Sequence, residues 1–103
     1  MTAARFAVAA VLAATPLLAA AQQSAQPSGR DLAASCAICH GTNGVSPGGM
    51  PRLAGQSAQT LVQHMRDFRE GKRPATIMHQ ITKGYTDPQI EAMAAYFAAQ
   101  KAN

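Results

Sequence analysis

The feature that most constrains this chain is a pair of cysteines followed directly by a histidine, in the string Cys36-Ala-Ile-Cys39-His40. The sequence has two cysteines, and both are in this string. A thioredoxin-like redox pair would need a βαβ context, and a zinc site would need a second ligand pair, which the isolated His64 and His79 do not supply. The string instead favours covalent attachment of one haem c. Cys36 and Cys39 would bond to the vinyl groups, and His40 would bind the iron.

The size and composition of the chain also favour a core that is completed by a large apolar group. The 103 residues can form one small domain, and they include no Trp, three Phe and two Tyr. Domains of this size bury little apolar surface and usually need a further stabilising element. We therefore expect the haem to fill part of the core.

The charge of the chain is mildly basic, with a formal net charge of +4 from nine Lys plus Arg and five Asp plus Glu. No run of Lys and Arg occurs, which argues against nucleic acid as a partner. The excess is compatible with docking to an acidic protein surface.

The N-terminal residues have the pattern of an export signal. Arg5 precedes an apolar stretch over residues 6–20, and the small residues 19–21 form a cleavage pattern. An uncleaved membrane anchor is the alternative, but the stretch is shorter than the roughly 20 apolar residues that a span needs. We therefore expect a periplasmic protein with no membrane span after signal cleavage. The predicted boundaries are a signal peptide over 1–21, a flexible leader over 22–29 and a monohaem cytochrome domain over 30–103.

The spacing of apolar residues predicts an all-α fold, with three main helices, one short helix and long loops around one haem. No stretch alternates in the manner of a strand. The glycine-rich segment 41–55 is expected to be a functional loop because of its length. The predicted helices cover residues 30–37, 57–70 with Ser57 as the cap, 76–83, and a last segment capped by Thr86 or Asp87.

The second axial ligand of the iron is expected to be a methionine, because His/Met ligation raises the potential of a haem. The candidates are Met50, Met65, Met78 and Met93. Met65 and Met93 lie in apolar helical stripes, where core packing is expected. Met50 lies on the loop that must cover the His40 side. Met78 is far enough along the chain to reach the opposite face, so it is the predicted ligand. A bis-His haem through the adjacent His79 is the alternative.

Two further residues bear on the site. A metal-bound imidazole normally donates its other N–H to a carbonyl or carboxylate, and the Pro51 carbonyl is the expected acceptor for His40. The alternative is that Pro51 only stiffens the loop. His64, in the middle of a predicted helix, is expected to be partly exposed and without a role. Candidates to rim the haem edge or bind its propionates, unless they form an ordinary solvated surface, are Arg52, Lys72, Arg73 and Lys83.

Several of these motifs resemble those of a known family. The segments 36–44, 50–56 and 68–74 resemble class I cytochromes c of the c4/c553 type. The segments 75–85 and 90–97 are similar to the cytochrome subunit of flavocytochrome c sulfide dehydrogenase. This resemblance implies a cytochrome c fold in which the first helix packs across the last, near Tyr96 and Phe97. It also implies axial ligation by His40 and Met78, with the Pro51 carbonyl holding His40.

The resemblance implies an electron carrier rather than an enzyme. In the leading hypothesis, the chain is the haem subunit of a flavoprotein sulfide dehydrogenase and passes single electrons to a downstream cytochrome or oxidase. The alternatives are a free soluble shuttle to a terminal oxidase or other acceptor, and a gas or ligand sensor with an open iron site. One departure from the resemblance concerns repeats. Cytochromes c4 carry two haem domains in tandem, whereas this sequence has one Cys-x-x-Cys-His string.

Overall fold

The computed structural model describes Ala3 and residues 26–102, and within these residues it contains helices and no β-strand. The predicted all-α fold class is confirmed. The predicted signal peptide, apart from Ala3, and residues 22–25 of the predicted leader lie outside the described residues. The α-helices and short 3₁₀ helices are α1 (Gly29–Ala33), η1 (Ala34–Cys36), α2 (Ala37–His40), η2 (Thr42–Gly44), α3 (Ala58–Arg69), α4 (Met78–Ile81), η3 (Thr82–Gly84) and α5 (Asp87–Ala98).

The first helical segment is continuous from α1 through η1 to α2, and it ends at His40. Ser28 caps its start, because the Ser28 Oγ accepts a hydrogen bond from the Asp31 N–H at 3.2 Å. The predicted end near Ala37 was wrong, as was the placement of Gly29 in the leader. No residue before Gly41 opposes helical dihedral angles, so Cys39 and His40 form the last turn of the helix instead of following it.

The caps of α3 and α5 are those that the sequence predicts. The Ser57 Oγ accepts from the Thr60 N–H at 3.1 Å. At α5 the cap is Thr86, which forms a complete capping box with Gln89. The two bonds of this box measure 2.9 and 3.3 Å. Gly71 follows α3 with a φ of +74°, which is the left-handed conformation typical of a residue that ends a helix.

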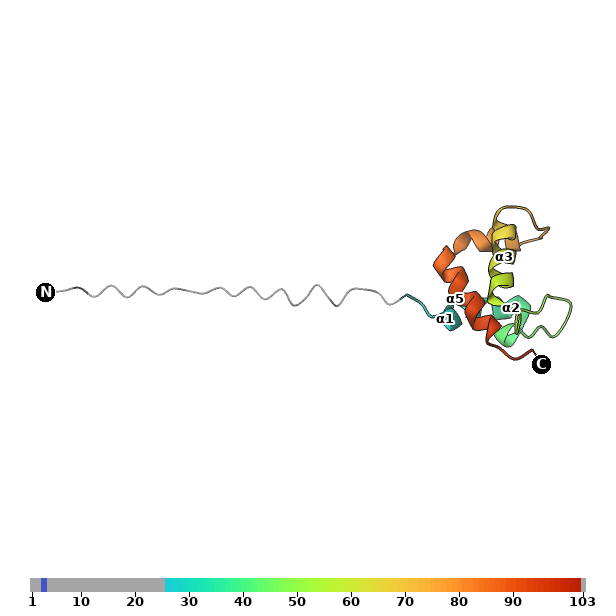
Figure 1. Cartoon of the computed structure of the whole chain (residues 1–103), viewed down its shortest axis with the longest axis horizontal. Helices are drawn as coiled ribbons and strands as arrows, with labels where there is room; N and C mark the ends of the chain where they lie inside the picture. The colour runs from blue at the N-terminus through green and yellow to red at the C-terminus, as the bar shows by residue number, and fades with distance from the viewer. Residues whose placement is uncertain (1–2, 4–25, 103) are drawn as a thin grey trace.

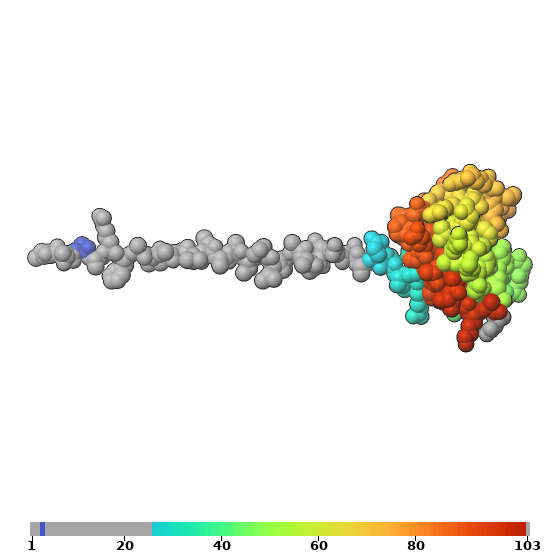
Figure 2. Space-filling model, in the orientation of Figure 1, coloured from blue at the N-terminus to red at the C-terminus, as the bar shows by residue number. Residues whose placement is uncertain are grey.

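The core lies where α1, α3 and α5 meet, and its buried residues are Ala33, Leu61, Ile90, Met93, Ala94 and Phe97. Figures 1 and 2 show α3 and α5 side by side, with α1 against α5. The first helix crosses the last at Gly29, as expected. A Cβ atom at Gly29 would lie 2.8 Å from the Ala92 carbonyl carbon and 3.4 Å from the Tyr96 Cβ. Glycine therefore allows the two backbones to approach closely.

Arg69, the last residue of α3, links the start of the segment between α3 and α5 to the end of that segment. Its guanidinium donates to the Asp87 carboxylate at 2.7 Å and to the Tyr85 carbonyl at 2.9 Å. The short helix in this segment begins at Met78, two residues later than the predicted Thr76. No side chain caps it, and Ile77 precedes it with a non-helical φ of −138°. Along the part of the chain that the structure describes, no helix is long and apolar enough to cross a membrane.

Candidate functional site

A large apolar cavity of ≈ 920 Å³ lies between α3, α5, the end of the first helical segment and the loops on either side of α3. Protein interiors are close-packed, and a void of this size falls in the range of about 300–1,000 Å³ that is typical of ligand pockets. All the predicted site residues line it, namely Cys36, Cys39, His40, Pro51 and Met78. The fold therefore brings together the five residues that the sequence predicts to hold the haem.

The two cysteines and His40 occupy one end of the first helical segment. Residues three apart on a helix share a face, so Cys36 and Cys39 are both presented to the cavity. Their thiols are free, with Cys36 half-buried and Cys39 exposed. Burial raises the pKa of the Cys36 thiol from its usual value. His40 is 7% exposed, so it is a buried residue of the cavity wall.

The hydrogen bonds of His40 define the direction in which its ring can bind a ligand. The His40 Nδ1 lies 2.6 Å from the Pro51 carbonyl oxygen, which is the acceptor expected from the sequence. Because a carbonyl can only accept, Nδ1 carries the proton and Nε2 has a free lone pair. That Nε2 is buried and has no hydrogen-bond partner. An unpaired buried polar atom costs about 1–3 kcal/mol, so this nitrogen is suited to a metal.

A compact loop after His40 brings Pro51 into position. Gly41 turns the chain with a φ of +83°, and a Cβ there would lie 2.7 Å from the carbonyl carbon of Val45. The carbonyl of Gly44 then accepts hydrogen bonds from the N–H groups of Leu53 and Ala54, at 2.9 and 3.1 Å. These bonds close the loop, so the segment that contains Pro51 returns beneath the imidazole.

Four methionines, Met50, Met65, Met78 and Met93, line the cavity. Met93 is buried in the core, as expected. Met65 packs against the core but also faces the cavity, so core packing is only part of its environment. Met50 is 44% exposed and precedes Pro51, on the His40 side. Met78 is the first residue of α4, and it stays the predicted second ligand.

The two remaining histidines differ in their relation to the cavity. His64 is half-buried and lines the cavity, although it was expected to have no role. The signal was present in the sequence, because His64 continues the i, i+3, i+4, i+7 stripe of Leu61, Met65 and Phe68. His79 is half-buried but is not among the cavity-lining residues, and its Nδ1 is buried without a partner.

The rim of the cavity carries positive charge. Arg73 lines it, with its Cζ 5.3 Å from the centroid of the Phe68 ring. A second predicted rim residue, Lys72, instead pairs with Glu70 at 2.6 Å, and this hydrogen bond raises the pKa of Lys72. No Asp or Glu of the described residues lines the cavity. The lining is therefore apolar with a basic edge.

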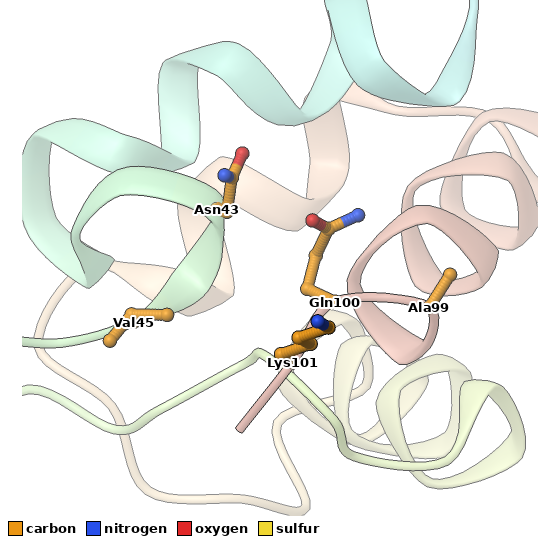
Figure 3. Close-up of a pocket in the computed structure, with 5 residues that line it drawn as sticks. All are labelled: Asn43, Val45, Ala99, Gln100 and Lys101. Atoms are coloured by element: carbon orange, nitrogen blue, oxygen red, sulfur yellow. The ribbon is translucent and has the colours of Figure 1, made fainter. Parts of the chain in front are cut away.

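A second, smaller pocket of ≈ 430 Å³ lies at the end of α5 (Figure 3). Asn43 and Val45 form one side, and Ala99, Gln100 and Lys101 form the other. None of the predicted site residues lines this pocket. The chemistry is therefore concentrated in the large cavity.

The residues of the large cavity fit a haem. A flat apolar group matches the apolar walls, and the unpaired His40 Nε2 supplies one iron ligand. Two thiols three residues apart lie beside it, and thioether sulfurs line the same space.

Comparisons with known proteins agree with this fit. Residues 27–101 match the model of the cytochrome c family. The chain is 40% identical to cytochrome c4 of Pseudomonas aeruginosa over 74 residues, which are 71% of this chain and 37% of the relative. It is 41% identical to the cytochrome subunit of sulfide dehydrogenase of Chlorobaculum tepidum over 69 residues, which are 67% of this chain and 63% of that subunit.

A solved structure of cytochrome c4 from Acidithiobacillus ferrooxidans is similar in both sequence and fold. It is 41% identical with a TM-score of 0.59, and the match covers 62% of this chain and 38% of that one. The chain thus spans less than two thirds of the length of each of these three proteins. The family match covers most of this chain and includes the whole cavity. The chain belongs to the cytochrome c family, whose members hold a c-type haem and carry electrons instead of catalysing reactions themselves.

Proposed function

We propose that this chain is a periplasmic monohaem electron carrier. In this proposal Cys36 and Cys39 would hold the haem through two thioether bonds, and His40 and Met78 would bind its iron. The domain that does this is expected to span residues 30–103. The observation that carries the proposal is the His40 ring, whose Nδ1 donates to the Pro51 carbonyl while its Nε2 faces the cavity side unpaired.

The protein residues have two tasks in this function. The Pro51 carbonyl fixes the tautomer and orientation of His40, and the apolar walls exclude water, so little has to move when the charge of the site changes. A haem bound here supplies an iron that takes up and returns one electron at a time. Cys39 is exposed and the neighbouring Ile38 is 88% exposed, so this edge is open to a redox partner.

The attachment is tested by the intact mass of the exported protein. We expect the mass of the chain after signal cleavage plus one haem. The double variant Cys36→Ser, Cys39→Ser is the matched control, and it should lack the added mass. A wild-type mass without the haem would refute the proposal.

An open iron site is tested separately by adding carbon monoxide to the reduced protein. Ligation by Met78 predicts that carbon monoxide binds poorly. Ready binding would instead support a gas or ligand sensor.

We further propose that the electron donor is a flavoprotein that oxidises sulfide. The support is the 41% identity with the Chlorobaculum tepidum subunit, which matches over 67% of this chain. Sulfide would be oxidised on the flavoprotein, and this chain would accept the electrons singly. The second candidate is a free shuttle to a terminal oxidase or other acceptor, and it is supported by the 40% identity with cytochrome c4.

Purification of the tagged native protein distinguishes these two candidates. The subunit proposal predicts a stable complex that contains flavin and whose haem becomes reduced when sulfide is added. A monomer that stays oxidised in sulfide, but is oxidised by membranes after chemical reduction, would refute the subunit proposal and support the shuttle.

A further inference from the structure

His64 is a titratable side chain that faces the cavity and has no part in the function proposed above. It lies on the cavity face of α3 with Leu61, Met65 and Phe68, and it is half-buried. Histidine is the side chain whose charge changes most readily near neutral pH. A histidine in this position therefore places a variable charge on the wall of the electron-carrying site.

The position of His64 within the cavity points to one side of the haem. The vinyl groups of a haem and its two propionates lie on opposite edges of the ring, so thioether bonds at Cys36 and Cys39 would direct the propionates away from α2. Figure 1 shows α3 running away from α2 toward the loop that contains Arg73. His64, near the middle of α3, and Arg73, in the loop after α3, both line the cavity. No Asp or Glu of the described residues lines that space, so anionic propionates would meet basic groups there.

We propose that His64 lies on the propionate side of the bound haem and takes up a proton when the iron is reduced. This inference rests on the haem attachment proposed above. If the bound iron gained one electron from the donor, a fraction of a proton per electron would bind the free imidazole nitrogen of His64 from solvent, at pH values near the pKa of His64. Both leave again when the next acceptor oxidises the iron. Electron transfer through this chain would therefore depend on pH.

The electrostatic surroundings of His64 explain the direction of this coupling. Burial lowers the pKa of His64, and the nearby Arg73 guanidinium lowers it further, while the Asp67 carboxylate one turn along α3 opposes them. A ferric iron adds one more positive charge than a ferrous iron does. Reduction therefore removes a charge that disfavours the imidazolium, and the pKa of His64 rises.

The other groups around the cavity leave His64 as the side chain that titrates near neutral pH. From α5 the lining residues are the apolar Ile90, Met93, Ala94 and Phe97, and from α4 they are Met78 and Ile81. Besides His64 and Arg73, the titratable lining residues are Cys36, Cys39, His40 and Tyr85. The first three are bonded to the haem or its iron in the proposed function.

The test is the reduction potential of the holoprotein as a function of pH, between about pH 5 and 9. We expect the acid dissociation constant of His64 to be roughly threefold smaller in the reduced state than in the oxidised state. This is the effect expected when a unit charge changes across a partly hydrated cavity. Because a tenfold change in an equilibrium constant corresponds to 59 mV for one electron, the reduction potential should fall by about 28 mV as the pH rises through the titration of His64. The variant His64→Gln should lack this fall.

A matched control moves the histidine away from the cavity. The double variant Gln59→His, His64→Gln has the same number of histidines but places one on the exposed face of α3, and its potential should match that of His64→Gln. An unchanged pH dependence in His64→Gln would overturn the inference.

A second measurement does not depend on any variant. The NMR titration of His64 in the wild-type holoprotein should give a higher pKa in the reduced state, and equal values in both states would overturn the inference. A missing covalent haem would refute the proposed function itself. A normal haem with no His64 effect would refute only this inference.

Discussion

Replacing Gly29 by alanine tests whether the crossing of α1 and α5 supports the whole site. At this crossing an added Cβ would lie 2.8 Å from the Ala92 carbonyl carbon and 3.4 Å from the Tyr96 Cβ. Ala92 is in the middle of α5, where its carbonyl is fixed by the helix, so it cannot move aside cheaply. The strain therefore has to be relieved by displacing α1, which leads directly into the segment that contains Cys36.

The expected cost follows from two opposing effects. Overpacking at a close contact costs about 1–3 kcal/mol. Alanine restricts the unfolded chain more than glycine does, and this effect offsets roughly 0.4–1 kcal/mol of that cost. We therefore expect Gly29→Ala to lower the free energy of unfolding by about 1 kcal/mol. For a domain of this size, such a change lowers the unfolding temperature by roughly 4–8 °C.

The assay is thermal unfolding of the holoprotein, followed by circular dichroism and by the haem absorption band. Gly48→Ala is the matched control, because no atom lies within 4 Å of a Cβ at that position. Its unfolding temperature should be unchanged or slightly higher. If Gly29→Ala unfolds within about 1 °C of the wild type, the close approach of the two backbones does not have the energetic role described here.

Two further predictions concern the second iron ligand and the link between α3 and α5. Met78→Ala should keep its covalent haem but show a lower reduction potential and bind carbon monoxide when reduced. Met50→Ala should keep both the potential and the poor carbon monoxide binding of the wild type; the opposite pair of results would assign the ligand to Met50. The Arg69 hydrogen bond and charge hold the pKa of Asp87 below its usual 3.8, so this pair stabilises the fold above about pH 4 and the effect is lost as the pH falls. In urea unfolding, Asp87→Asn should therefore be less stable than the wild type at about pH 7, and the difference should shrink as the pH falls below about 4; an equal difference at about pH 7 and about pH 2.5 would contradict this origin.

The helices of this fold were largely predictable from local sequence. The cap at Ser57 and the apolar spacing after it define α3 almost to the residue, and the predicted caps place the start of α5 within one residue. The end of the first helix was misplaced, because Cys39 and His40 can both face the cavity from the last helical turn, so the chain does not have to leave the helix before His40. The start of α4 was misplaced because no capping side chain marks it.

The candidate site was predictable in its residues but not in its full lining. The string around Cys36 and the position of Pro51 were enough to expect the contacts of His40. The position of His64 on the cavity wall was missed, because a helical stripe that faces a cofactor cavity has the same period as one that faces a packed core. For the same reason, the spacing of the methionines did not show that all four line one space.

The cavity also has a consequence for the order in which the protein is assembled. A domain of about 75 residues normally has a small free energy of unfolding, and here a space of ≈ 920 Å³ lies within its apolar interior. Until that space is filled, the helices around it lack much of their contact area. The chain is therefore expected to stay largely unfolded after export, with Cys36 and Cys39 accessible to whatever attaches the haem. Attachment would then trigger folding, so newly exported chains without haem would be the ones most exposed to proteases.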